Sequence, residues 1–112
     1  MSNIVYDKYG NYRPNLNGAL DENNCARIWT NSKGQRHRED GAAVEYASGS
    51  KFWFINGERH REDGPAVEWL YGRKSWYING IYFSKDEWLQ YLKSGQSSLD
   101  QKTILKLILE NS

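Results

Sequence analysis

The sequence predicts a mainly β protein: an antiparallel sheet of repeated β-hairpins followed by two C-terminal α-helices, α+β overall. Three observations predict this fold class. Residues 57–68 repeat residues 34–45 closely with an offset of 23 residues, and a short fixed period is typical of repeat architectures. Asn-Gly pairs mark tight hairpin turns inside the repeats. After residue 83 the apolar spacing changes from that of a strand to that of a helix.

Single residues keep the same offset along the chain. The matching positions are Gly34, Gly57 and Gly80; His37 and His60; Trp53 and Trp76. The first unit is longer by one residue, because Trp29 lies eight residues before His37 whereas Trp53 lies seven before His60. We interpret this first unit as a divergent, capping repeat.

Length and composition indicate a single domain spanning residues 1–112. The chain has 15 basic and 14 acidic residues, a formal net charge of +1 and 14% aromatic residues. No region carries a large excess of either sign, which argues against binding of nucleic acid through bulk phosphate neutralisation and against a nucleic-acid mimic. A chain of this length has no room for a separate catalytic domain.

Targeting signals are not apparent in the sequence. The first eight residues lack an apolar signal core, and no apolar run approaches membrane-spanning length. The lone cysteine, Cys25, cannot form an internal disulfide, which fits a reducing compartment. We therefore expect a soluble, cytoplasmic protein without a membrane partner.

Residues 1–25 form the least regular segment. Ile4–Tyr6 and Tyr9–Tyr12 flank a Gly-Asn pair, a pattern that predicts a short hairpin. Residues 13–24 are rich in Asn, Gly and Pro and are expected to form a loop. A strand at residues 26–29 then opens the repeat region, which spans residues 26–83.

Each repeat is expected to contain two short antiparallel strands. Residues 47–50 and 71–72 close one end, and Asn-Gly pairs close the other, where two positive φ angles are needed. A two-residue turn at Asn56–Gly57 fixes three opposed pairs: Ile55 with Glu58, Phe54 with Arg59, and Trp53 with His60. Opposed residues share a face of the sheet.

Strand alternation divides the apolar side chains between two faces. We assign one face to the core, and it carries Trp53, Ile55, Trp76 and Ile78. The other face carries Phe52, Phe54 and Tyr77. That face is exposed unless the C-terminal helices cover it, and both arrangements stay open.

Residues 84–112 are predicted to form two helices. Ser84 and Glu87 match a capping box ahead of apolar residues at i, i+3 and i+4 spacing, and Gly95 is a natural stop. A second capping box, Ser98–Gln101, precedes the strongly apolar residues 103–109. Their aliphatic side chains cover more than one stripe. Part of this helix is therefore expected to pack on the sheet, and another part to be exposed or to contact a second subunit.

Two His-Arg-Glu-Asp segments carry chemically capable groups. A metal or acid–base site would use His37, Asp40, His60 and Asp63. The alternative is a repeated corner in which His packs on Trp, Arg and Glu pair between adjacent units, and Asp-Gly turns the chain. A catalytic set is normally asymmetric, and the spacing fits no zinc motif. No Cys-His signature surrounds Cys25. We favour the corner and expect no catalytic residue, metal or cofactor.

The face of Phe52 is a candidate surface for binding a protein, because aromatic and arginine side chains dominate binding hot spots. The candidate partner-binding residues are Phe52, Phe54, Arg59, Arg73, Lys74 and Tyr77. Single-stranded nucleic acid also stacks on aromatic rows, but the balanced charge favours a protein partner.

The pattern Trp-x-x-Asn-Gly-x-x-His with a 23-residue period resembles the MORN-type repeat. It is carried by Trp53, Asn56, Gly57 and His60, and by Trp76, Asn79 and Gly80. The usual His-Gly step is replaced by His-Arg-Glu-Asp-Gly-Pro-Ala at residues 60–66, which resembles MORN-like repeat proteins of tailed bacteriophages and some bacteria. The resemblance covers about residues 26–83 and implies a β-hairpin array that binds proteins; related bacterial repeats occur in antitoxins.

Small size, a rigid scaffold and this resemblance lead to an expected function. We expect a non-enzymatic protein-binding module, encoded by a phage, that inhibits a host protein such as a CRISPR effector or another defence enzyme by steric occlusion in the bacterial cytoplasm. The alternatives are a self-assembling scaffold protein that dimerises through its C-terminal helix and an antitoxin-like repeat protein. An enzyme or metal protein and a nucleic-acid binder rank below these.

Overall fold

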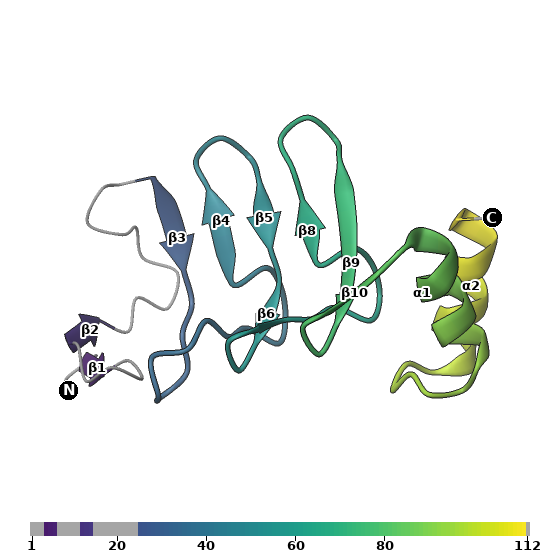
Figure 1. The fold of residues 1–112 in the computed structure, drawn as a ribbon, viewed down its shortest axis with the longest axis horizontal. Helices are drawn as coiled ribbons and strands as arrows, with labels where there is room; N and C mark the ends of the chain where they lie inside the picture. Colours follow the sequence, from purple (N-terminus) through teal and green to yellow (C-terminus); the bar gives the residue numbers. More distant parts are fainter. Residues whose placement is uncertain (1–3, 7–11, 15–24, 112) are drawn as a thin grey trace.

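The fold is a mainly β antiparallel arrangement followed by two helices, which confirms the predicted fold class. The computed structural model describes residues 4–6, 12–14 and 25–111. The strands of the repeats lie side by side, and the two helices stand beyond the last strand (Figure 1). In these described ranges, no helix is long and apolar enough to cross a membrane.

A six-stranded antiparallel sheet is the main layer, with the strand order β10-β9-β8-β5-β4-β3. Its strands are β3 (Ala26–Ile28), β4 (Val44–Tyr46), β5 (Lys51–Phe52), β8 (Val67–Glu68), β9 (Lys74–Ile78) and β10 (Ile81–Phe83). A separate hairpin consists of β6 (Phe54–Ile55) and β7 (Glu58–Arg59). The predicted strand region at residues 26–83 is therefore built from short antiparallel strands.

A two-stranded pair precedes the repeats. β1 (Ile4–Tyr6) and β2 (Tyr12–Pro14) pair antiparallel, with Tyr6 opposite Tyr12. An antiparallel pair is present as predicted, but β2 begins at Tyr12, where the predicted segment Tyr9–Tyr12 ends, and extends into residues 13–14, where a loop is expected from the sequence. The rest of that expected loop, residues 15–24, lies outside the described residues.

The Asn-Gly turns have the conformation that their sequence predicts. Asn56 and Gly57 have φ angles of +49° and +84°, and the equivalent turn at Asn79–Gly80 has +50° and +79°. Such paired positive φ angles define the tight hairpin turn that matches strand twist. The register Phe54–Arg59 and Ile55–Glu58 is confirmed. The His60 N–H donates to the Trp53 carbonyl at 3.2 Å, which continues that register.

The first apolar cluster of the sheet lies on the face of Phe52, so the predicted assignment of the core to the other face is wrong for Trp53 and Ile55, which are only half-buried. It holds for Ile78, which is buried, and for Trp76, which packs against the helices. The first apolar cluster consists of Ala26, Val44, Phe52 and Val67, with Ile28, Phe54 and Tyr77 packed against it. The strand register explains why Phe52 is buried. Val44 on β4 and Val67 on β8 both stand directly opposite Phe52, which lies between them and is only 8% exposed.

A second apolar cluster joins the helices to the end of the sheet. The helices are α1 (Lys85–Lys93) and α2 (Gln101–Asn111). Trp88, Leu89, Leu92 and Ile104 are buried in it, and Trp76 and Phe83 of the sheet pack against them. The Trp76 and Trp88 rings stack at 5.9 Å. The helices therefore cover the Trp76 side of the last strands, and the Phe52 side is not covered by either helix.

One helix start matches its prediction and the other does not. Ser84 and Glu87 form the predicted capping box. At α2 the cap is Asp100, because its carboxylate accepts from the Thr103 N–H at 2.9 Å and its carbonyl from the Ile104 N–H at 3.0 Å. The hydrogen bonds from Thr103 lower the pKa of Asp100. The predicted cap, Ser98, forms its hydrogen bonds with Glu62 instead.

Candidate functional site

Four of the six predicted partner-binding residues lie on one face. They are Phe52, Phe54, Arg59 and Tyr77. The sequence leaves open whether this face is exposed or covered by the helices; Phe52 itself is buried, and the two flanking valines bury it. The Arg59 guanidinium carbon lies 5.7 Å from the centre of the Phe52 ring, which brings the predicted arginine and aromatic side chains together.

The other two predicted residues lie apart from this group. Lys74 stands opposite Glu68, and the next residue of its strand, Ser75, stands opposite Val67. Because successive residues of a strand point to opposite faces, Lys74 lies on the face away from Phe52 and Tyr77. Arg73 is exposed beside the strand, where its carbonyl closes a turn by accepting from the Trp69 N–H at 2.8 Å.

An alternating row of arginine and aromatic side chains, here called the arginine–aromatic ladder, crosses successive hairpins. Its members are Arg36, Phe54, Arg59, Tyr77 and Tyr82. The Arg36 guanidinium lies 5.7 Å from the Phe54 ring centre. Arg59 stands opposite Phe54, lies 5.3 Å from the Tyr77 ring centre and donates to its hydroxyl at 3.3 Å. The Tyr77 and Tyr82 rings meet edge to face at 5.6 Å.

Arg36 is absent from the residues predicted from the sequence. The signal that identifies it is the repeat itself, because Arg36, Arg59 and Tyr82 are successive positions of the 23-residue offset. The ladder therefore has arginine in its first two repeats and tyrosine in its third. Tyr82 is 59% exposed, so the ladder ends on an exposed aromatic ring.

A hollow of about 370 Å³, here called the aromatic hollow, lies beside the ladder. It is lined by Arg36, Val44, Tyr46, Ser50, Phe52, Phe54, Arg59 and Trp69. The rings of Tyr46 and Trp69 meet Phe52 edge to face at 5.5 and 5.1 Å. These two rings are 38% and 43% exposed, so they offer apolar surface on either side of the buried Phe52.

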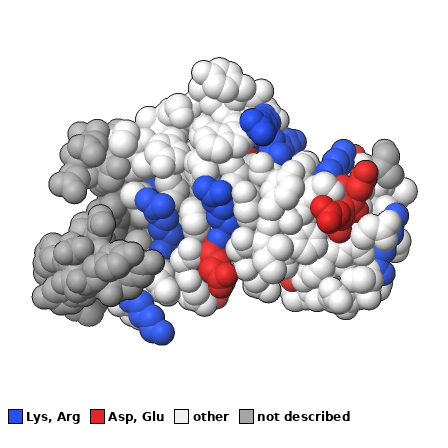
Figure 2. Space-filling model, in the orientation of Figure 1, with Lys and Arg blue, Asp and Glu red and all other residues white. Residues whose placement is uncertain are grey.

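Among the residues that the structure describes, the face of the ladder carries arginines without matching carboxylates. The acidic residues of the described strands are Glu45, Glu58 and Glu68. All three lie on the other face of the sheet, because their cross-strand partners belong to that face. On that other face the register builds a row of alternating charge: Arg27, Glu45, Lys51, Glu68 and Lys74. Basic side chains lie over the middle of the sheet in the view of Figure 2, with an acidic side chain directly beside them.

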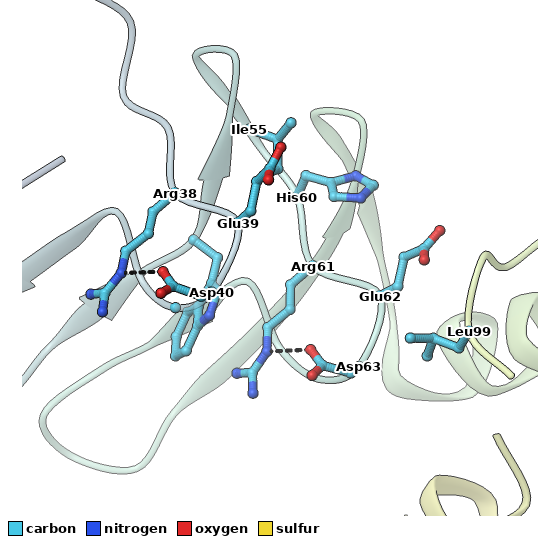
Figure 3. Close-up of a pocket in the computed structure, with 11 residues that line it drawn as sticks. Arg38, Glu39, Asp40, Ile55, His60, Arg61, Glu62, Asp63 and Leu99 are labelled. Atoms are coloured by element: carbon cyan, nitrogen blue, oxygen red, sulfur yellow. Dashed lines mark hydrogen bonds and ion pairs between the residues drawn. The ribbon is translucent and has the colours of Figure 1, made fainter. Parts of the chain in front are cut away.

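The two His-Arg-Glu-Asp segments form structural corners on the face opposite the ladder. Arg61 donates from Nε to Asp63 at 2.8 Å (Figure 3). One of its terminal nitrogens donates to Glu68 at 3.3 Å, and its guanidinium lies 4.0 Å from the Trp53 ring centre. The same contacts recur one repeat earlier among Arg38, Asp40, Glu45 and Trp29. The arginine thus pairs with acids of its own unit, so the expected pairing between adjacent units is wrong.

The corner histidines join neighbouring repeats. The Nδ1 atom of His37 accepts from the Asn56 N–H at 3.0 Å, and that of His60 accepts from the Asn79 N–H at the same distance. Each histidine thereby holds the tight turn of the next hairpin. Within residues 25–111 and the two N-terminal strands, no group of three His, Cys, Asp or Glu side chains is arranged to hold a metal ion.

The glutamate of the second corner fastens the helices to the repeats. The Glu62 carbonyl accepts from the Trp88 indole N–H at 2.7 Å, and its carboxylate accepts from the Tyr91 hydroxyl at 3.0 Å and from the Ser98 N–H at 3.2 Å and hydroxyl. Burial and then the Glu62 carboxylate raise the pKa of Tyr91. The two corners and Leu99 line a groove of about 670 Å³ (Figure 3).

Comparisons with known proteins assign this chain to no group, since no family model, curated protein or solved structure matches it. The MORN-like resemblance therefore stays a prediction.

Proposed function

We propose that the protein is a non-enzymatic protein-binding module that presents the arginine–aromatic ladder and the aromatic hollow to a partner. The supporting observation is the combination of exposed aromatic rings with two arginines on the sheet face that neither helix covers. Aromatic and arginine side chains are enriched at binding hot spots. Hydrogen bonds repeated between neighbouring hairpins hold the face in place.

The biological setting of this module is proposed from the resemblance of residues 26–83 to MORN-like phage proteins. We propose that a phage encodes the protein and that it acts in the bacterial cytoplasm, where it occludes the working surface of a host protein such as a CRISPR effector or another defence enzyme. A small rigid array suits this role, because occlusion requires a stable surface and no chemistry of its own.

Affinity capture with mass spectrometry tests the proposal. The full chain is used as bait in bacterial lysate, beside a Tyr46→Ala, Trp69→Ala variant of the hollow and a matched Lys51→Ala, Lys74→Ala variant of the opposite face. We expect a stoichiometric partner that the hollow variant loses and the control retains. The proposal is wrong if no protein is captured stoichiometrically, or if both variants capture it equally.

A second candidate function is self-assembly through α2. Leu105 and Leu109 of this helix are 57% and 77% exposed, and exposed leucines on one helix are typical of a contact with another subunit. Light scattering of the full chain and of a Leu105→Glu, Leu109→Glu variant distinguishes the two cases. A dimer that the variant abolishes supports self-assembly, and a monomer at high micromolar concentration contradicts it.

A further inference from the structure

We propose that the partner docks through an acidic segment, which places two carboxylates on Arg36 and Arg59 and one large apolar side chain in the aromatic hollow. This inference rests on the proposed protein-binding function and specifies the chemistry of the partner. It follows from the charge, the spacing and the shape of the ladder face.

The charge argument compares the ladder arginines with the corner arginines. Arg38 and Arg61 each lie over a tryptophan and each pair with two carboxylates. Arg36 and Arg59 also lie over aromatic rings, but the described part of the chain provides neither with an ion pair. A guanidinium held against a ring is preorganised to bind a carboxylate through two parallel hydrogen bonds. The missing anions are therefore expected from the partner.

The spacing argument follows from the strand order of the hairpins. The Arg38 N–H donates to the Phe54 carbonyl at 3.1 Å, so the segment containing Arg36 lies beside the strand of Phe54, and that strand pairs with the strand of Arg59. The strands of the two arginines are two strand spacings, about 10 Å, apart. Residues that share a face of an extended segment are an even number of positions apart, and two or four positions span about 7 or 13 Å. We therefore expect two acidic residues two or four positions apart.

The shape argument concerns the aromatic hollow, which shares Arg36 and Arg59 with the ladder. Its floor is the buried Phe52, and its exposed walls are Tyr46 and Trp69. A large aliphatic or aromatic side chain of the docking segment fills this space, and the carboxylates beside it meet the arginines at its rim. An apolar anchor surrounded by polar contacts is the usual anatomy of a binding hot spot.

The same face suits a single-stranded nucleic acid less well. Stacking on aromatic rings is common to both partners, but nucleic-acid affinity depends on many neutralised phosphates. The ladder offers two arginines, its third repeat has Tyr82 at the equivalent position, and the whole chain has a net charge of only +1. The observations therefore favour a protein segment.

A selection experiment tests this chemistry without knowledge of the partner. Random dodecapeptides are selected on the full-length chain, and the strongest binder is measured by fluorescence anisotropy. We expect two acidic residues next to a large apolar one. Replacing its acids by glutamine and, separately, the Arg36→Ala, Arg59→Ala substitution should each weaken binding about tenfold or more. The Lys51→Ala, Lys74→Ala variant removes the same charge from the opposite face and should bind normally.

The possible results distinguish a failure of the acidic-segment inference from a failure of the proposed protein-binding function. Selected peptides without acidic residues, or equal losses in both double variants, overturn the acidic segment and leave a protein-binding function intact. Tighter binding of oligo(dT) than of any selected peptide overturns it in favour of nucleic acid. If no peptide is selected, the inference fails, and lysate capture then decides separately whether the binding function also fails. The glutamine peptide on the unmodified chain keeps the test valid if an arginine variant misfolds.

Discussion

The segments 37–41 and 60–64 have the same sequence, His-Arg-Glu-Asp-Gly, yet their glutamates have different surroundings. The Glu39 side chain is 85% exposed, and its nearest basic atom is Nε2 of His37 at 3.7 Å. Glu62 accepts hydrogen bonds from the first helix and from the segment that leads to the second. The other positions of the two corners make equivalent contacts. Position in the array, and not local sequence, therefore decides the role of the glutamate.

The largest expected loss of stability comes from removing Glu62, and removal of Glu39 is the matched control. Glu62→Ala removes the acceptor of the Ser98 N–H and hydroxyl and one of the two acceptors of the half-buried Tyr91 hydroxyl, which should lower the free energy of unfolding by about 2 kcal/mol. Glu39→Ala should change it by less than about 0.5 kcal/mol. Urea unfolding followed by tryptophan fluorescence measures both. Equal losses in the two variants would refute the difference between the corners.

Alanine substitution of the corner glycines, Gly41 and Gly64, should reduce stability equally, because each glycine leaves room for the arginine of its own corner. A Cβ at Gly41 or Gly64 would lie 2.9 Å from Cζ of Arg38 or Arg61. Either alanine substitution should displace the guanidinium from its tryptophan and its acids and cost about 1 kcal/mol. Thermal unfolding of the two variants provides the measurement. Losses that differ by more than the experimental error would show that the equivalence is incomplete.

The helix attachment should weaken in alkali. Burial, followed by the Glu62 carboxylate, raises the pKa of Tyr91 above its ordinary value. The folded state thus favours the neutral phenol, and this contribution is present below the ordinary tyrosine pKa and lost as the pH rises through the raised value. Stability measured against pH should fall more steeply in the unmodified chain than in a Tyr91→Phe variant. Identical alkaline slopes would contradict this.

The smallest expected effect is a loss of stability at low pH. The hydrogen bond from Arg38, followed by its charge, lowers the pKa of Asp40. The resulting stabilisation is present above the ordinary aspartate pKa and lost as the pH falls through the lowered value. Asp40→Asn should therefore be slightly less stable than the unmodified chain at neutral pH, and the difference should vanish in strong acid. A difference that persists in strong acid would assign it to packing and not to charge.

Features set by near neighbours in the chain could be predicted from the sequence. The register from Phe54 to Arg59 follows from one Asn-Gly turn, and the start of the first helix from Ser84 and Glu87. The predicted second cap, Ser98, is wrong because Ser98 satisfies its hydrogen bonds with Glu62, 36 residues away. Arg36 is absent from the predicted partner-binding residues, although the repeat offset identifies it.

The sequence by itself determined the repeat, the hairpin turns and the alternation of side chains along each strand, because these depend on backbone conformation and on residues a few positions apart. Only the tertiary structure decided which face is the core. Phe52 is buried because strands distant in sequence place Val44 and Val67 on either side of it. Likewise, Glu62 holds the helices and Glu39 does not, because only the second corner lies beside Trp88 and Tyr91.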